Sequence, residues 1–162
     1  MGTADRRQHV ISLTWAQLHQ DVRSLAAQLA SKGSFKGIVA VARGGLVPAG
    51  ILARECNILL VETVCIRSCE AQAYAPEVRV LKAFSQDEGL GWLAVDDMAA
   101  TGRTAALLRT MLPKAHISAV YAKEQGIAYL DSFAVKVPQD SWLLLPWDSQ
   151  LPVPPRNTKK ST

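Results

Sequence analysis

Apolar residues recur along the chain at two spacings, and the alternation between them predicts the order of its elements. After Thr14, leucine and valine residues recur every three or four positions, which predicts a helix that ends at Lys32 and Gly33. Thr14 and Gln17 have the spacing of a capping box at the start of this helix. Two further helices are expected over 46–55 and 104–112, and strands over 38–41, 58–66, 79–83, 92–95, 117–122 and 133–137.

Strands that alternate with helices favour an α/β fold, in which a mostly parallel sheet is flanked by helices on both faces. No internal repeat or linker divides the sequence, so residues 1–162 are expected to form a single domain. Three segments lack periodicity: we expect residues 1–11 to be a loose N-terminal arm, 67–78 a flexible loop, and 156–162 a mobile basic tail.

Composition and charge narrow the classes of protein that fit. Apolar residues make up 49% and charged residues 20%, as in an ordinary globular domain, and no apolar run is long enough to span a bilayer. The polar N-terminus shows no signal peptide, and the odd number of cysteines, Cys56, Cys65 and Cys69, has no metal-ligand spacing. We therefore expect free thiols in the cytoplasm and no zinc site. The net charge of +4 suits small anionic substrates, and equally a weak affinity for nucleic acid or acidic lipid.

The segment from Leu93 to Thr104 combines an apolar strand, two adjacent carboxylates and a small-residue loop that opens a helix. Open α/β sheets bind ligands at the carboxyl ends of their strands. Backbone N–H groups of a Thr-Gly-Arg-Thr loop at a helix N-terminus can bind a phosphate group. Asp96 and Asp97 can accept hydrogen bonds from sugar hydroxyls or hold magnesium, whereas a simple helix cap needs only one carboxylate. The segment therefore predicts a site for a phosphorylated sugar.

This segment resembles the phosphoribosyl-pyrophosphate motif of the type I phosphoribosyltransferases. Residues 42–49 resemble the pyrophosphate loop of the bacterial xanthine-guanine branch of that family. Ala122-Lys123, together with residues 138–142 and 146–148, is similar to the purine-binding end of the same branch. The similarity runs in order and spacing from Thr14 to Pro155. It implies the type I fold, with a flexible flap over residues 67–78 and a small C-terminal hood that binds the base.

The resemblance implies a role for each segment at the sugar end of the site. Asp96 and Asp97 are the expected catalytic residues, facing the ribose hydroxyls, and Arg43 and Gly44 are expected to bind the pyrophosphate. Magnesium is the expected cofactor, with Asp97 as its ligand, because Mg²⁺ prefers oxygen donors and is usually shared between carboxylates and substrate phosphates. The 5-phosphate is assigned to the loop formed by Ala100, Thr101, Gly102, Arg103 and Thr104.

At the purine end, the resemblance implies three base-binding residues: Lys123, Trp147 and Asp148. Trp147 is the expected stacking surface, since each stack of a base on an aromatic ring contributes about 1–3 kcal/mol. Lys123 is expected to donate to an exocyclic carbonyl, which would select 6-oxopurines over adenine, and Asp148 to bind metal or orient the site. The remaining tryptophans are expected to pack in the interior: Trp15, Trp92 and Trp142.

Two positions depart from the pattern of the 6-oxopurine enzymes. Ala100 stands where those enzymes usually carry an aspartate that handles the proton at N7 of the base, and Arg103 replaces a glycine. Three explanations fit. The enzyme uses a 6-oxopurine without a side-chain base at a reduced rate, since acid–base assistance is worth about 10²- to 10⁴-fold; it accepts a different nucleobase; or it binds the ligands without turnover.

The sequence thus predicts a magnesium-dependent purine salvage enzyme that moves the 5-phosphoribosyl group from phosphoribosyl pyrophosphate to xanthine, guanine or hypoxanthine and releases pyrophosphate. Its expected partners are these two substrates and further copies of itself, as a dimer or tetramer, with no specific nucleic acid and at most weak peripheral membrane contact. The alternative is a nucleotide-sensing or regulatory binding protein. An RNA-binding regulator would need a dense basic face, and outside the tail the sequence shows none.

Overall fold

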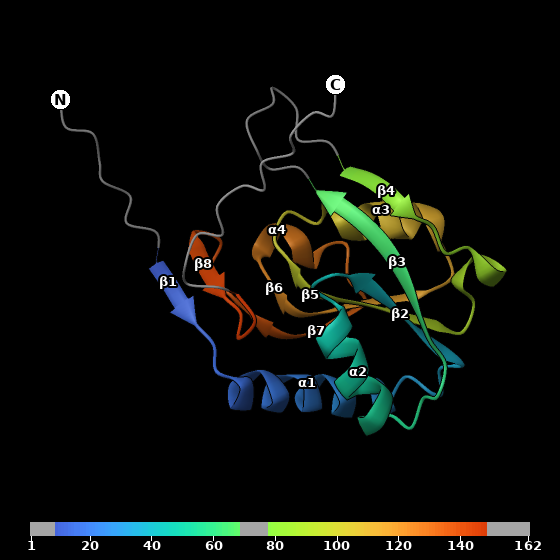
Figure 1. Ribbon diagram of the computed structural model, residues 1–162, viewed down its shortest axis with the longest axis horizontal. Coiled ribbons are helices and arrows are strands. Elements are labelled where there is room, and N and C mark those ends of the chain that lie inside the picture. Colours follow the sequence, from blue (N-terminus) through green and yellow to red (C-terminus); the bar gives the residue numbers. More distant parts are fainter. Residues whose placement is uncertain (1–8, 69–77, 149–162) are drawn as a thin grey trace, which may run out of the picture.

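The structure is a computed structural model that describes residues 9–68 and 78–148 (Figure 1). Its elements follow one another in the order β1 (His9–Ser12), α1 (Trp15–Ala30), β2 (Gly37–Ala42), α2 (Leu46–Glu55), β3 (Val61–Ser68), β4 (Val78–Lys82), the 3-10 helix η1 (Gln86–Gly89), β5 (Trp92–Ala99), α3 (Arg103–Met111), β6 (His116–Ala122), α4 (Glu124–Ile127), β7 (Ser132–Lys136) and β8 (Ser141–Leu144). Within these residues, no helix is both long and apolar enough to cross a membrane.

Six of the described strands form one sheet in the order β4-β3-β2-β5-β6-β7. All neighbours in this sheet run parallel except β4, which pairs antiparallel with β3. The chain leaves β2 towards β3 on one side and returns to β5 on the other, so the strand order reverses between β2 and β5. Open α/β sheets bind their ligands at such a reversal point, beyond the carboxyl ends of the strands. The topology therefore directs attention to the ends of β2 and β5.

Helices cover both faces of this sheet, which confirms the predicted fold class (Figure 1). Helices α1 and α2 pack on one face, where Leu25 and Leu52 are fully buried, and α3 packs on the other through Leu108. The central strands are buried on both faces, and they read as continuous apolar runs for that reason.

Polar contacts join α1 to the carboxyl-terminal part of β6 and cap the start of α1. The Tyr121 hydroxyl donates to the buried Asp21 carboxylate at 2.7 Å, and the Gln17 amide donates to the same carboxylate at 2.8 Å. Burial raises the pKa of Tyr121. Thr14 Oγ1 accepts from the Gln17 backbone N–H, as the capping box predicts, but the Gln17 side chain contacts Asp21 instead of returning to Thr14.

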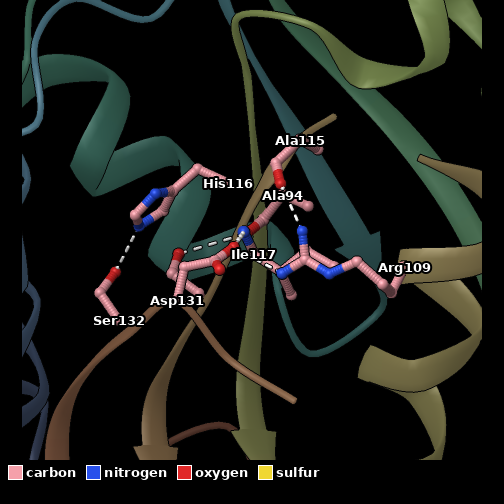
Figure 2. Close-up of polar contacts among 8 residues, drawn as sticks. Ala94, Arg109, Ala115, His116, Ile117, Asp131 and Ser132 are labelled. Carbon is pink, nitrogen blue, oxygen red and sulfur yellow. Dashed lines mark hydrogen bonds and ion pairs between the residues drawn. The ribbon is translucent and has the colours of Figure 1, made fainter. Parts of the chain in front are cut away.

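A second network lies at the amino-terminal edge of β6 and β7 (Figure 2). The Asp131 carboxylate accepts hydrogen bonds from the Ile117 backbone N–H at 2.7 Å and from the Arg109 guanidinium at 2.6 Å. His116 Nε2 lies 2.8 Å from Ser132 Oγ, and burial lowers the pKa of His116. These contacts tie α3 to the two strands at the edge opposite their carboxyl ends.

Several expected boundaries need correction. Residues 9–11 are not part of a loose arm, because they pair in parallel with β8 and form a separate two-stranded sheet. Residues 67, 68 and 78 belong to β3 and β4 rather than to a loop. The strand expected over 92–95 continues to Ala99, because its end still pairs with β6. The remainder of the arm, the loop over 69–77 and the tail over 156–162 lie outside the described residues.

Candidate functional site

The site is a cavity of about 660 Å³ at the carboxyl ends of β2, β3 and β5. It lies at the point where the strand order reverses, as the topology leads one to expect. Polar and apolar residues from four strands, the turn after β2 and the start of α3 line it: Val41, Ala42, Arg43, Gly44, Cys65, Ile66, Arg67, Leu81, Asp96, Asp97, Met98 and Thr104.

The turn after β2 brings its backbone against the end of β5. The peptide between Ala42 and Arg43 is cis, and Arg43 is exposed. A Cβ atom at Gly44 would overlap the carboxylate of Asp97, and one at Gly45 would overlap a backbone carbonyl of β5. Both glycines are therefore required by close approach, and the Arg43–Gly44 turn and the β5 carboxylates form one continuous surface.

The two carboxylates lie in the second half of strand β5 and are only partly exposed. Asp96 Oδ1 accepts from the Asp97 backbone N–H at 2.9 Å, and Asp97 Oδ1 accepts from the Met98 backbone N–H at 2.7 Å. Burial raises the pKa of Asp96 well above its usual range, and the neighbouring Asp97 raises it further. Burial also raises the pKa of Asp97, against hydrogen bonds that lower it. A cation or a hydroxyl donor in the cavity would therefore stabilise the ionised form of either carboxyl.

The loop expected to bind the 5-phosphate opens α3. Gly102 is the N-cap residue with a φ of 79°, and a Cβ atom there would overlap the ring of Tyr129. Thr104 lines the cavity, whereas Thr101 and Arg103 are exposed at its margin. The loop follows β5 directly, so its backbone N–H groups lie at a helix N-terminus beside the carboxylates.

Helix α4 braces this loop from the other side. The Lys123 backbone N–H donates to the Ala99 carbonyl at 3.0 Å, and a Cβ atom at Gly126 would overlap the same carbonyl. The end of β5, the loop and the start of α4 are therefore packed at backbone distance. This contact places Lys123 next to the phosphate loop.

The Lys123 side chain is directed to the small two-stranded sheet of β1 and β8. Its ammonium donates to the carbonyls of Ser141 at 2.6 Å and Gln139 at 3.2 Å. Gln139 Oε1 in turn accepts from the Gln125 backbone N–H at 3.2 Å. A lysine ammonium has three donors, so two are used here and one remains for a ligand.

Two of the four tryptophans differ from their expected placement. Trp147 packs partly buried against the core, with its ring 5.9 Å from that of Trp15. Trp92 is buried as expected, but Trp15 and Trp142 are 55% and 51% exposed, so the assignment of these two to the interior is wrong. Trp142 directly follows Ser141, the residue whose carbonyl accepts from Lys123, and its ring is exposed on the small two-stranded sheet.

Asp148 is exposed, and its Oδ2 accepts from the Leu145 backbone N–H at 2.8 Å. Its charge contributes to the raised pKa of Asp97, so the two carboxylates lie within electrostatic reach of each other. Within the described ranges, no group of three or more His, Cys, Asp or Glu side chains could hold a metal by itself. A magnesium ion that shares Asp97 with substrate phosphates fits this donor set, because it needs only one or two protein carboxylates.

The cavity brings together five of the residues assigned from the sequence: Arg43, Gly44, Asp96, Asp97 and Thr104. The others lie around it, in the phosphate loop or at the hood. Sequence analysis did not assign the β3 and β4 residues of the lining to the site. It placed Cys65, Ile66 and Leu81 in strands without a functional role, and Arg67 in the flexible loop. The β-branched residues of β3 and β4 are the feature of the sequence that indicates strands here.

Known proteins resemble this chain over most of its length. The model of the phosphoribosyl transferase domain matches residues 14–149. Xanthine-guanine phosphoribosyltransferase of Nitratidesulfovibrio vulgaris (strain Hildenborough) is 51% identical over 93% of this chain and 92% of its own. The protein of the same name from Desulfotalea psychrophila is 45% identical over 91% of each chain. The crystal structure of purine phosphoribosyltransferase from Pyrococcus horikoshii has a TM-score of 0.74 at 20% identity, covering 86% of this chain and 95% of the other.

Replacing Asp96 with Asn should stabilise the free protein at pH 7. Because the pKa of Asp96 is raised in the folded state, the folded protein binds a proton more tightly than the unfolded chain, and stability falls as pH rises from about 4 through the raised pKa. We expect the melting temperature of the variant to exceed that of the wild type by about 2–4 °C at pH 7, the shift that 1 kcal/mol produces at this chain length.

The difference between the two proteins should shrink as pH approaches 4, where the wild-type carboxyl is protonated. Thermal melts of both proteins across this pH range measure the effect. The exposed Asp140 provides the matched control, as Asp140→Asn changes the formal charge equally. A lower melting temperature for Asp96→Asn at pH 7 would contradict the assignment of a buried, destabilised carboxylate.

Proposed function

The chain belongs to the phosphoribosyltransferase family, and on this premise we propose that it is a purine salvage enzyme. It moves the 5-phosphoribosyl group from phosphoribosyl pyrophosphate to N9 of a 6-oxopurine and releases pyrophosphate. Xanthine, guanine and hypoxanthine are the acceptors. The observation that carries this proposal is the cavity at the reversal point, where a Gly-Gly turn, a carboxylate pair and a phosphate-type helix start converge.

Each part of the donor matches one part of this surface. The 5-phosphate is bound by the backbone N–H groups and hydroxyls of Ala100–Thr104 at the start of α3. Asp96 and Asp97 accept hydrogen bonds from the ribose hydroxyls, and Arg43 and Gly44 bind the pyrophosphate. Magnesium, when bound at Asp97, neutralises charge on the phosphates. Catalysis then consists mainly of positioning the reactants and stabilising the charge that develops as the bond to pyrophosphate breaks.

The base is selected at the other end of the site. Two of the three Lys123 donors contact backbone carbonyls, so the third is held in a fixed direction and can donate to one exocyclic oxygen of the base. A 6-oxopurine carries an acceptor there, whereas adenine carries an amino group, which is a donor. Asp148 lies within reach of the Asp97 charge and contributes to metal or base orientation.

The sensing alternative is not favoured, because the 45–51% identical relatives named above bear the names of transferases. Assembly into a dimer or tetramer stays part of our proposal. It is supported by an exposed apolar run at Leu59, Leu60 and Val61, in which Leu59 is 95% exposed. The cytoplasm likewise stays the predicted location.

A turnover assay tests the function directly. The full chain is incubated with phosphoribosyl pyrophosphate, Mg²⁺ and one of xanthine, guanine, hypoxanthine, adenine or uracil, and pyrophosphate release is measured. We expect turnover with the three 6-oxopurines and rates at least about 100-fold lower with adenine, because its amino group leaves the Lys123 donor unpaired. Absence of turnover with every base, with donor binding retained, would exclude the enzyme and favour the sensing alternative.

Restoring an acid at position 100 tests whether proton handling limits the reaction. Ala100→Asp should raise kcat with guanine by about 10-fold or more, within the range that general acid–base catalysis provides. The gain should follow a pH profile that the wild type lacks, since only the variant titrates there. Ala100→Asn is the matched control, because it has the same shape and no titrating group. Equal rates for all three proteins would show that this proton transfer is not limiting.

Two single substitutions separate the candidate stacking residues. If the exposed Trp142 supports the base, Trp142→Ala should raise the KM for guanine by about 10-fold, as expected for the loss of one stack, and leave the melting temperature nearly unchanged. Trp147→Ala should lower the melting temperature, because its ring packs against the core and near Trp15. A rise in KM confined to Trp147→Ala would instead support the role that the sequence assigned to Trp147.

A further inference from the structure

Two arginines face each other across the β3–β4 ribbon at the rim of the cavity. The antiparallel register pairs Arg67 directly with Arg79, so both side chains lie on the same face of the ribbon. Both are exposed, and Arg67 lines the cavity together with Arg43. Like charges placed directly opposite each other on neighbouring strands are destabilising. This pair therefore has an energetic cost in the free protein that an anion between the two guanidinium groups would remove.

Protein groups do not supply this anion within the part of the chain that the structure describes. There, no acidic side chain lies within ion-pairing distance of Arg43, Arg67 or Arg79. The acidic residue that does pair on this ribbon is Glu62, which lies 4.0 Å from Lys82 towards the opposite end. The two carboxylates in the cavity belong to β5, on the far side of β2 from the ribbon.

The parallel register of β2 and β3 sets the height of the pair. Ala42, the last residue of β2, is level with Cys65, so Arg67 lies two residues further along β3. Two residues of an extended strand correspond to about 7 Å. The pair therefore stands beyond the end of β2, beside the Arg43–Gly44 turn.

We propose that Arg67 and Arg79 form a cationic clamp that binds the outer phosphate of the pyrophosphate group and neutralises it as the leaving group departs. The turn at Arg43 and Gly44 binds the inner phosphate, next to the ribose carboxylates. Paired guanidinium groups suit a phosphate because each can donate two parallel hydrogen bonds to its oxygens. This inference rests on the proposed function, since that function supplies the pyrophosphate.

Direct binding of inorganic pyrophosphate tests the clamp. The full chain is titrated with pyrophosphate and Mg²⁺ by calorimetry, and separately with ribose 5-phosphate, which has no pyrophosphate group. Arg67→Gln and Arg79→Gln should each weaken pyrophosphate binding by about 10-fold, as expected for the loss of charge-assisted hydrogen bonds, and leave ribose 5-phosphate affinity within about twofold. Arg79→Lys should lose less pyrophosphate affinity than Arg79→Gln, because lysine keeps the positive charge and lacks only the two parallel hydrogen bonds of the guanidinium group.

Arg54→Gln is the matched control, because Arg54 is an exposed arginine at the end of α2 that does not line the cavity. It should bind pyrophosphate like the wild type. An equal loss in Arg54→Gln, or an equal loss for ribose 5-phosphate, would reduce the effect to general charge and overturn the clamp. Unchanged pyrophosphate affinity in both Arg67→Gln and Arg79→Gln would also overturn the clamp.

Thermal melts without ligand exclude a purely structural role for the pair. The melting temperature of Arg79→Gln should stay constant or rise, because the substitution removes a like-charge contact. A clear decrease in both variants would assign the arginines to stability and overturn the clamp. If the wild type bound pyrophosphate through these arginines but turned over no base, the proposed function would fail and the clamp would stand. If the wild type turned over a base and both variants kept the wild-type affinity for pyrophosphate, the proposed function would stand and the clamp would fail.

Discussion

The carboxylate of Asp97 lies directly against the backbone of Gly44, and the site is arranged around this contact. The two residues come from β5 and from the turn after β2, the neighbouring strands between which the strand order reverses. No side chain fits between them, so the Arg43–Gly44 turn and the Asp97 carboxylate are held at a fixed spacing. Burial raises the pKa of both β5 carboxyls, so a cation or a hydrogen-bond donor bound in the cavity would favour their ionised forms.

A second close approach fixes the other end of the sugar site. Gly102 starts α3 with a positive φ and lies under the ring of Tyr129, while Gly126 of α4 packs on the Ala99 carbonyl. Gly44, Gly102 and Gly126 each lie so close to a neighbouring group that no Cβ atom would fit. The phosphate loop and the Arg43–Gly44 turn therefore have little freedom to adjust. Such preorganisation lowers the entropic cost of aligning a charged donor, which is the main contribution that the protein makes to a reaction of this type.

The sequence allowed most of the sheet and the β2 and β5 residues that line the cavity to be predicted, because both depend on local signals. Helix α2 was predicted at its observed bounds, Leu46–Glu55, from the Gly-Gly turn before it and its apolar pattern. The pairing of His9–Ser12 with Ser141–Leu144 was not predicted, since it joins segments more than 120 residues apart with no periodicity of their own. For the same reason Arg67 was assigned to a loop: only its register with Arg79 places it in a strand.

The two ends of the site use different physical means, and this difference bears on the missing aspartate at position 100. At the base, Lys123 is oriented by the carbonyls of Gln139 and Ser141 and, as we propose, would select a ligand through singly charged contacts. At the leaving group, the proposed carboxylates, arginines and metal would act on a group that carries several charges. A transition state of oxocarbenium character develops its largest charge change where the bond to pyrophosphate breaks, so neutralisation there has the greater effect on the barrier. A proton acceptor at N7 would act on the purine and not on the bond to pyrophosphate. A chain with Ala100 therefore retains the contribution made by neutralising charge at the leaving group.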